Sequence, residues 1–482
     1  MNGKKIGFAQ IPIGTKVTVV SELPDELMVI REAGEEPFKI SKDSLVAKQV
    51  TPESNRATKL TTAETNPATL PQGVPSLDAM AGDWIPMTNV ANPPAVHNFN
   101  QMLVVDRDLT SFFCNPGGLY PWKHGYPIVT LSINGKEYPA TETRCYAYQA
   151  LRRNQDCNGL SVETDTRMVN EQRGVLCQIT ATNTTSQTIH TAMTLQVPGK
   201  LQPDGLGVMN DTQITNIVSF IRPSVKPDSV TTTTNGLCWN WTLEVPAGGT
   251  VKLGFVAGDE AKEKAPQTEA RVADWAAHFS SLFDECKSIW EQRWADAFTP
   301  ENNHFSGHLP ALATTNAALA RNYYMGVQTM LALERTQFSV SSQSFITSGE
   351  RADGVQYYWD ASMQATVWAL LEPVGMKAPL RRWLVQNPRS GSTVNIQYSG
   401  NKYDEKHHDR ITGYAFNAST IFKTADEYLR VTRDLAFLDE KLDDKKTVLD
   451  HLDALAMDWE TLPKGPHGLG NYGENKNLLE CA

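Results

Sequence analysis

The chain has 482 residues, of which 40% are hydrophobic, 20% charged and 9% aromatic, a composition typical of a globular protein. Its formal net charge is -10, and acidic and basic residues are interspersed without an extended cationic stripe, so nucleic acid is not expected as a partner. No apolar run reaches the roughly 20 residues that a membrane-spanning helix needs, so we expect no membrane span.

A chain of this length is expected to contain about two to four domains. Short β-like runs occur at residues 16–20 and 27–30 and are separated by turn signals, so residues 1–50 are interpreted as a small SH3-like β-barrel. Residues 51–72 are rich in Thr, Pro, Ala and Asn and show little apolar periodicity, which indicates an extended linker.

Residues 73–258 predict a large antiparallel β domain. Short segments, such as residues 175–181 and 191–197, alternate polar and apolar side chains. The dipeptides Asn134-Gly135 and Asn235-Gly236 are hairpin signals between such segments. Regular strand spacing over this length favours a sandwich of two sheets, here a β-supersandwich.

From residue 259 onward, apolar residues recur at helical spacing. Trp275, Phe279, Trp290 and Trp294 fall on one face of a predicted linker helix over residues 259–306. Further helices are predicted over residues 310–333, 358–372, 376–386, 413–432 and 435–460. Residues 307–482 therefore predict an antiparallel array of helical hairpins.

The helical part contains short motifs that resemble six-hairpin glycosidases. They are Phe-Ser-Gly-His-Leu-Pro at residues 305–310, Asn-Tyr-Tyr at 322–324, Leu-Glu-Arg at 333–335 and Gly-Val-Gln-Tyr-Tyr-Trp-Asp at 354–360. The Tyr-Tyr-Trp-Asp motif is similar to the first trehalase signature, and more loosely to the processing α-glucosidases, which share a helical toroid and an N-terminal supersandwich. The resemblance covers residues 75–482. It implies that residues 307–482 form part of an (α/α)6 barrel that carries the catalytic site.

The resemblance implies a glycoside hydrolase that cleaves glucosidic or similar linkages in oligosaccharides. In trehalases the Trp-Asp pair lines the subsite for the non-reducing sugar, which makes Tyr358, Trp359 and Asp360 candidate substrate-binding residues. Arg351 is a further candidate, although it lies one residue further from Trp359 than the trehalase pattern requires. The trehalase motif Glu-Ser-Gly-Trp-Asp, which carries the catalytic acid, is absent, so trehalose is not the favoured substrate.

Glycoside hydrolysis needs one protonated carboxyl group and one carboxylate on opposite sides of the scissile bond. Glu474 and Glu480 are candidate catalytic residues because they follow a long helix and a Pro/Gly turn, where such toroids place an acid-bearing loop. Glu480 also follows Leu478 and Leu479, and apolar surroundings would raise its pKa as a general acid requires. Only about half of the toroid's hairpins are predicted, so we expect a C-terminally truncated barrel whose second carboxylate lies beyond Ala482.

Other interpretations remain open at this point. Asp360 has an ordinary alternative role as a helix N-terminal aspartate beside a core tryptophan. The protein could also be a non-catalytic carbohydrate-binding or assembly protein, or a glycoside phosphorylase on the same fold. No metal site and no cofactor are predicted, because neither the scattered cysteines nor residues 403–410, which contain adjacent histidines, match a metal-binding pattern.

The compartment is also open. The resemblance implies a periplasmic or extracellular protein, whereas residues 1–6 lack the apolar stretch of a signal peptide. The expected partner is an oligosaccharide or glycan substrate.

Overall fold

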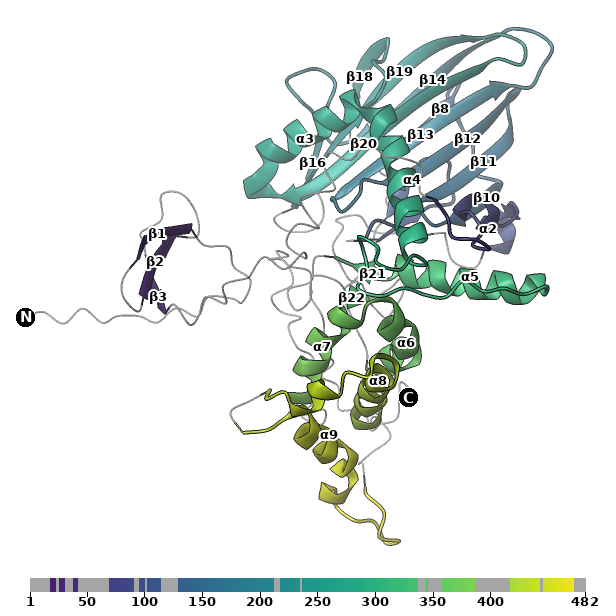
Figure 1. Cartoon of the computed structure of the whole chain (residues 1–482). Coiled ribbons are helices and arrows are strands. Elements are labelled where there is room, and N and C mark those ends of the chain that lie inside the picture. Colours follow the sequence, from purple (N-terminus) through teal and green to yellow (C-terminus); the bar gives the residue numbers. More distant parts are fainter. Residues whose placement is uncertain are drawn as a thin grey trace, which may run out of the picture. The chain divides into compact units, whose positions relative to one another are not determined.

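In a computed structural model of the chain, the described residues are 18–22, 26–30, 38–41, 69–90, 95–99, 102–113, 129–211, 217–234, 236–336, 344–345, 358–385, 417–442 and 445–471. They belong to two units, Met1–Thr65 and Asn66–Ala482 (Figure 1). In the first unit, β1 (Thr18–Glu22), β2 (Glu26–Ile30) and β3 (Phe38–Ser41) form an antiparallel sheet. A complete SH3-like barrel stays a prediction.

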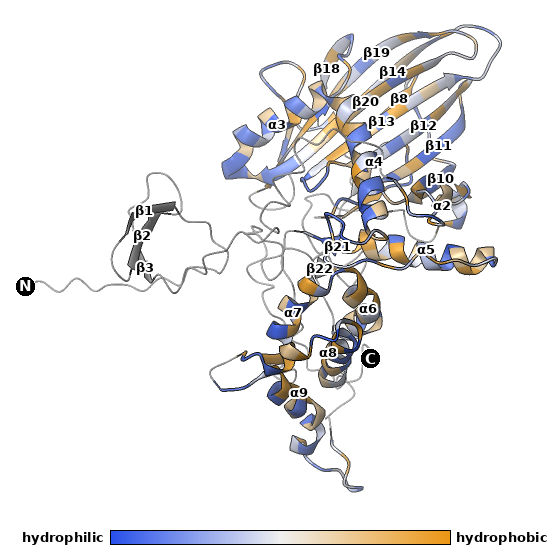
Figure 2. Ribbon diagram, in the orientation of Figure 1, coloured by the Kyte–Doolittle hydropathy of each residue, from blue (hydrophilic) through white to orange (hydrophobic). Residues whose placement is uncertain are grey.

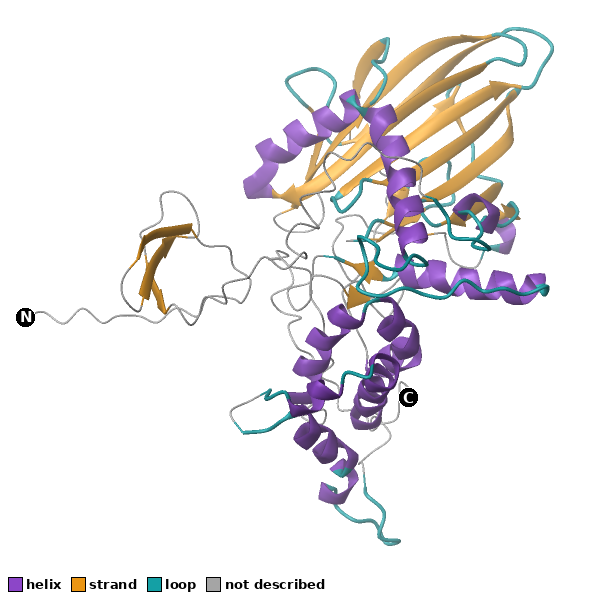
Figure 3. Ribbon diagram, viewed as in Figure 1, coloured by secondary structure: helices purple, strands orange, loops and turns teal. Residues whose placement is uncertain are grey.

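The second unit contains two large antiparallel sheets, whose strands are orange in Figure 3. The nine-stranded sheet has the order β15 (Lys200–Leu201), β16 (Val208–Asp211), β17 (Ile217–Pro223), β20 (Thr250–Ala261), β13 (Gly174–Asn183), β12 (Leu160–Met168), β11 (Gln149–Cys157), β10 (Glu142–Tyr146) and β4 (Ile85–Pro86). The five-stranded sheet has the order β18 (Ser229–Thr233), β19 (Gly236–Val245), β14 (Ile189–Pro198), β8 (Thr130–Ile133) and β9 (Lys136–Glu137). A smaller sheet contains β5 (Ala95–His97), β6 (Met102–Val105) and β7 (Phe112–Phe113).

The two large sheets enclose one hydrophobic core. Leu195 and Trp239 from the five-stranded sheet are fully buried in the same cluster as Val162 and Phe255 from the nine-stranded sheet. Because side chains alternate between the two faces of a strand, each strand contributes one apolar row to this core. The predicted antiparallel β architecture is therefore confirmed, and the chain combines large β sheets with a helical part.

The hairpin predicted at Asn134-Gly135 is confirmed. Both residues have positive φ angles, 50° and 78°, and they connect β8 to β9, which pair as antiparallel neighbours. Two successive positive φ angles are the requirement of a type I′ turn, which Asn and Gly tolerate better than other residues.

Helix α3 (Ala265–Ala277) covers part of the nine-stranded sheet. Its Val272 and Trp275 are buried in one cluster with Phe220 of β17 and Val256 of β20. The indole of Trp275 lies so close to β13 that a Cβ atom on Gly174 would come within 2.4 Å of it. Glycine at this strand position therefore allows helix α3 to approach the sheet.

Helix α4 (Phe279–Asp296) connects the sheets with the helical part. Its Trp290 and Trp294 belong to the second large core, together with Tyr324 of α5 (Ala317–Ala332) and Trp368 of α6 (Tyr358–Leu371). The remaining elements are β21 (Glu334–Arg335), β22 (Ser344–Phe345), α7 (Pro373–Val385), α8 (Asn417–Thr432), η7 (Leu435–Asp439), α9 (Val448–Ala456) and η8 (Asp458–Thr461), besides the short α2 (Leu77–Met80) and η3 (Met87–Asn89) near the start of this unit.

The helices predicted over 310–333, 358–372, 376–386 and 413–432 are confirmed as α5 to α8, with boundaries shifted by up to seven residues. The single helix predicted over 435–460 is wrong. The chain leaves the helix after Asp439 and starts α9 only at Val448, where Thr447 and Asp450 form a capping box. Such reciprocal side-chain caps favour a new helix start over a continuous helix.

Side-chain contacts establish the directions of α6, α7 and α8. Tyr358 at the start of α6 packs against Trp383 near the end of α7, so these two helices are antiparallel. Lys377 near the start of α7 binds Asp434, just beyond the end of α8, so α7 and α8 are antiparallel too. Helices α6 and α8, which pack against each other, therefore run in the same direction and begin at the same end. A complete toroid stays a prediction.

Substitution of Gly174 by alanine tests the close packing of α3 on the sheet. Because the added methyl group would overlap Trp275, we expect Gly174→Ala to lower the free energy of unfolding by roughly 1–3 kcal/mol. The matched control is Gly326→Ala in α5, where a built Cβ meets no heavy atom within 4 Å. Alanine there should stabilise the helix by about 0.5–1 kcal/mol. Urea denaturation of both variants measures the difference, and equal effects would contradict this packing.

Candidate functional site

The first turn of α6 carries three of the predicted site residues. Tyr358 is buried, and its ring meets the indole of Trp383 edge-on, with the ring centroids 5.2 Å apart. The ring centroids of Trp383 and Trp368 are in turn 6.4 Å apart, and Trp368 is also fully buried. These aromatic contacts anchor the start of α6, because each edge-to-face pair adds to the burial of its rings.

Trp359 and Asp360 lie on the outer side of the same turn. Trp359 is 40% exposed, and Asp360 is partly exposed. The Ser362 hydroxyl donates a hydrogen bond of 2.7 Å to the Trp359 carbonyl oxygen and so reinforces the turn. A carboxylate in the first turn is favoured by the positive end of the helix dipole. The turn thus presents an aromatic surface beside an acidic group.

An apolar stripe continues from Trp359 along α6. Its members are Met363, Val367 and Leu370, spaced three or four residues apart, and Met363 is 66% exposed. Figure 2 shows hydrophobic residues along this helix, whose opposite face is buried in the core. A helix that is apolar on both faces is suited to contacts on both sides. The outward stripe is therefore an exposed apolar surface that begins at the candidate site.

The start of α8 lies at the same end of the helix pair as the start of α6. In this first turn Asn417 is buried, Ser419 is exposed, and no acidic residue is present. The N-terminal ends of two helices therefore place partial positive charge at one end of the pair. Local sequence patterns do not point to Asn417 or Ser419, because the common end of α6 and α8 depends on the pairing of helices about sixty residues apart in the chain.

The other predicted site residues fall outside the described parts of the chain. These are Arg351 and both candidate catalytic residues, Glu474 and Glu480, as well as the histidine-containing segment 403–410. Of the predicted site residues, the structure describes Tyr358, Trp359 and Asp360. All three lie in the first turn of α6, where the Tyr358 side chain is buried and the Trp359 and Asp360 side chains reach the surface. Within the described ranges, no group of three or more His, Cys, Asp or Glu side chains could hold a metal ion. None of the described helices is long and apolar enough to cross a membrane.

The Leu-Glu-Arg motif at residues 333–335 contributes to a buried ion cluster. Arg293 of α4 donates hydrogen bonds to Glu334 at 2.6 Å and to Glu171 at 2.8 Å, and its guanidinium lies 3.8 Å from the ring centroid of Phe99. Glu334 and Arg335 are both fully buried. This cluster joins the sheet region, α4 and the helical part, so the motif has a structural role here.

The motif at residues 305–310 forms hydrogen bonds at the C-terminal end of α6, opposite the candidate site. The buried Glu372 accepts hydrogen bonds from the Ser306 backbone N–H at 2.8 Å and the Ser306 hydroxyl at 2.7 Å, and from the Gly375 N–H at 2.8 Å. Burial raises the pKa of Glu372, while these hydrogen bonds oppose that shift. This acid lies at the C-terminal end of α6, away from Trp359 and Asp360 at the N-terminal end.

His97 lies at the same junction as the ion cluster. Burial, together with the positive charge of Arg335, lowers the pKa of His97 from 6.5 to about 3. Among the described residues its Nδ1 atom is buried without a hydrogen-bond partner, while its backbone carbonyl accepts a hydrogen bond from the Trp290 indole at 3.2 Å. The imidazole is therefore neutral in the folded protein at ordinary pH.

Comparisons with known proteins give no family assignment. No protein-family model matches the chain, and no curated protein matches its sequence. Among solved structures, a bacterial glucoamylase complexed with acarbose has a TM-score of 0.44 and 8% identity, over 83% of this chain and 60% of that chain. A protein described as a kojibiose phosphorylase, from the human microbiome, has a TM-score of 0.42 and 10% identity, over 72% and 55% of the two chains.

A family GH92 inverting mannosidase from Bacteroides thetaiotaomicron has a TM-score of 0.36 and 11% identity, over 84% of this chain and 54% of that chain. The chain thus matches only between 54% and 60% of the length of these three proteins.

Removal of the Arg293 guanidinium tests the buried ion cluster. Arg293→Met leaves Glu334 buried without this counter-charge, so we expect a loss of roughly 3–5 kcal/mol in the free energy of unfolding. Lys287→Met on the same helix is the matched control, because Lys287 pairs with the exposed Asp78. Loss of this surface ion pair should lower the free energy of unfolding by less than about 1 kcal/mol. Denaturant unfolding compares the two, and a small effect of Arg293→Met would contradict the structural role of the cluster.

The lowered pKa of His97 predicts a defined pH dependence of stability. The folded state disfavours the charged imidazole, so the stability contributed by the neutral form is complete above pH 6.5 and is lost as the pH falls towards about 3. His97→Gln should reduce the slope of the unfolding free energy against pH by the amount that corresponds to about one bound proton. The matched comparison is His190→Gln, at an exposed position on β14. Urea unfolding at a series of pH values measures the slope of the unfolding free energy against pH. A slope in His97→Gln equal to that of the wild-type protein would exclude His97 as a source of the pH dependence.

Proposed function

We propose that the protein is a carbohydrate-active enzyme, namely a glycoside hydrolase that cleaves glucosidic or similar linkages in oligosaccharides. The observation that carries the proposal is the outward pair of Trp359 and Asp360 on the first turn of α6. Sugars expose flat apolar ring faces and hydroxyl groups, which suit an aromatic ring and a carboxylate, respectively. The resemblance of the Tyr-Tyr-Trp-Asp motif to trehalases supports the same assignment.

In this proposal Trp359 packs against a sugar face while Asp360 accepts hydrogen bonds from its hydroxyl groups. The positive end of the helix dipole favours a carboxylate at this position, and a carboxylate is suited to accepting hydrogen bonds. Tyr358 supports the turn from the core side, and its direct contact with substrate stays a prediction. Arg351 belongs to the same proposed subsite. Asp360 binds substrate and is not the proton donor.

The proton donor is proposed to be Glu480, with Glu474 as the alternative. If the enzyme inverts the anomeric configuration, water is the nucleophile and the two carboxyl groups lie roughly 6.5–9.5 Å apart. The proposal also includes a β-supersandwich over residues 73–258 and part of an (α/α)6 barrel over residues 307–482. An SH3-like barrel over residues 1–50 completes the proposed domain organisation.

Substitutions at Trp359 and Asp360 test this function. We expect Asp360→Asn and Trp359→Ala to lower kcat/KM on a panel of gluco- and manno-oligosaccharides by about a hundredfold, a loss of roughly 2.7 kcal/mol in transition-state stabilisation. Both side chains reach solvent, so the thermal unfolding midpoint should change little.

The matched controls are Asp453→Asn on α9 and Trp459→Ala in η8, where the indole is 44% exposed. These controls should keep full activity. Hydrolysis by the wild-type protein that is unaffected by both site substitutions would exclude Trp359 and Asp360 as the substrate subsite. Sugar binding without any turnover would instead favour a carbohydrate-binding protein.

A second candidate function is phosphorolysis of the same linkages. One observation favours it: the N-terminal ends of α6 and α8 lie at one end of the helix pair, and helix N-termini are suited to binding phosphate. The assay distinguishes the two reactions when it is run with and without inorganic phosphate. Strict dependence on phosphate, with release of a sugar phosphate, identifies a phosphorylase, whereas turnover without phosphate identifies a hydrolase.

A further inference from the structure

A groove lies in the sheet region, on elements that the proposed active site does not use. It has a volume of about 330 Å³ and is bordered by the loop of residues 106–111 and by the β8–β9 hairpin. The polar residues in its lining are Arg107, Asp108, Thr130, Glu137 and Tyr138. This volume is at the lower end of the range for ligand sites, roughly 300–1,000 Å³, and therefore suits a small ligand.

The two walls of the groove are joined by backbone contacts. Asp108 and Pro139 form an antiparallel β-bridge, and the Ala140 N–H donates a hydrogen bond of 3.0 Å to the Arg107 carbonyl oxygen. The β8–β9 wall is closed by the Asn134-Gly135 turn described above. The width of the groove is therefore set by the backbone.

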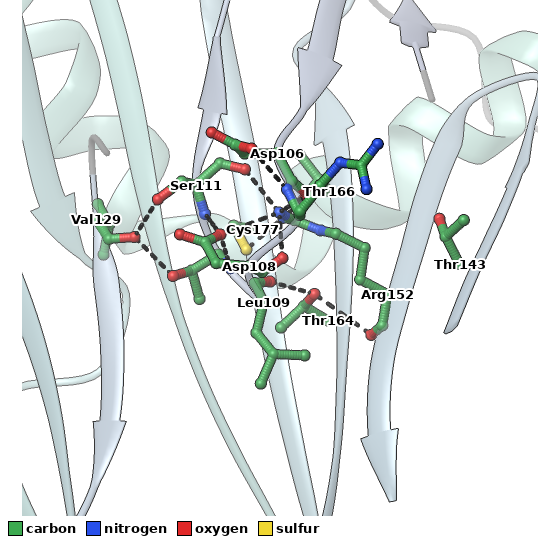
Figure 4. A network of polar contacts seen from close by, with 12 residues as sticks. Asp106, Asp108, Leu109, Ser111, Val129, Thr143, Arg152, Thr164, Thr166 and Cys177 are labelled. Atoms are coloured by element: carbon green, nitrogen blue, oxygen red, sulfur yellow. Dashed lines mark hydrogen bonds and ion pairs between the residues drawn. The ribbon is translucent and has the colours of Figure 1, made fainter. Parts of the chain in front are cut away.

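A fully buried arginine holds the loop wall in place, as Figure 4 shows. Arg152 donates hydrogen bonds to three loop carbonyl oxygens, at 3.3 Å to Asp106, 2.9 Å to Asp108 and 2.6 Å to Ser111. Its second terminal nitrogen donates to the Thr166 hydroxyl at 3.0 Å. Burial of a guanidinium costs free energy that these hydrogen bonds must offset. Arg152 thus fixes the backbone of the loop from the inside.

Neighbouring hydroxyl groups complete this support. Thr164 donates to the Leu109 carbonyl oxygen, and Thr110 and Ser111 donate to the Val129 carbonyl oxygen at 2.6 Å and 3.0 Å (Figure 4). Asp108 Oδ1 accepts hydrogen bonds from the N–H groups of Thr110 and Ser111. A ligand that enters the groove therefore has little loop ordering to bring about, which lowers the entropic cost of binding.

Several polar groups remain available to a ligand. Within the described part of the chain, Asp108 Oδ2, the Tyr138 hydroxyl and the Glu137 carboxylate make no hydrogen bond. The Tyr138 ring is partly buried, and Lys136 Nζ lies 4.8 Å from its centroid. The groove thus combines one aromatic ring with carboxylate and hydroxyl groups.

The charges around the groove select the class of ligand. Asp108 and Glu137 are acidic, and Arg107 and the adjacent Lys136 are basic, so the local charge is balanced. Neither an anion nor a cation is favoured by such a balance, whereas a neutral molecule with many hydroxyl groups can use both kinds of partner. We infer that this groove binds a neutral saccharide unit, as a site separate from the first turn of α6.

Methyl-labelled protein provides a direct test, because Leu109, Thr130 and Leu131 are lining residues of the groove that carry methyl groups. Glucose, mannose and maltose are titrated into the full-length chain carrying Asp360→Asn, so that binding at the proposed active site does not interfere. The expected result is saturable shifts of these methyl signals with a dissociation constant of roughly 1–10 mM. Because the readout is binding, it does not depend on whether the protein proves to be a hydrolase.

Two variants then assign the binding to this groove. Tyr138→Ala should weaken binding about tenfold. Glu244→Gln, at an exposed position on β19 away from the groove, should leave it unchanged. The inference is overturned if the sugars shift none of the three methyl signals, or if Tyr138→Ala binds as tightly as its parent. It is also overturned if inorganic phosphate or calcium, added in place of sugar, shifts these signals instead.

Discussion

A positive charge buried between the sheets and the helices must be neutralised where it lies, and this constraint organises the second unit of the protein. Arg293 meets Glu334 from the helical part and Glu171 from the loop between β12 and β13, while its guanidinium covers the ring of Phe99. Removal of either Arg293 or Glu334 would leave the other charge desolvated and without this partner, which is far more costly than the loss of a surface ion pair. Arg293 therefore couples the sheets and the helices in addition to the hydrophobic core that they share.

The sheet region uses a buried guanidinium in the same way. Arg152 lies between the two large sheets and binds backbone carbonyl oxygens of the loop before β7. In both places the cation specifies an arrangement of backbone and acid that apolar packing alone would leave undetermined. The two arginines thus explain how irregular segments, at the junction and at the groove, are held by regular strands and helices.

The helical part places its apolar groups on two sides. Tyr358, Trp368 and Trp383 form an aromatic core, whereas Trp359 and the apolar stripe that follows it point outward. Adjacent residues of a helix lie about 100° apart, so Tyr358 and Trp359 cannot share one environment. This division makes a packing role compatible with a binding role inside one short motif.

Two motifs on which the resemblance was based have structural partners in this protein. Glu334 neutralises Arg293, and Ser306 caps the buried Glu372 at the end of α6. From the sequence these residues were indistinguishable from site residues, because a motif does not reveal whether its side chains face a core or a ligand. The helix predicted over 435–460 was wrong for a related reason, since its periodicity did not show the restart at Thr447.

Local patterns were sufficient for the antiparallel strands, the Asn134-Gly135 hairpin and the helices α5 to α8, because alternation, turn conformation and helical spacing act between near neighbours in the chain. Other features needed the tertiary structure. They include the common end of α6 and α8, the ion cluster of Arg293 and the groove supported by Arg152. Each depends on contacts between residues far apart in sequence, where the energy of burying a charge or an aromatic ring is decided by partners that no local pattern specifies.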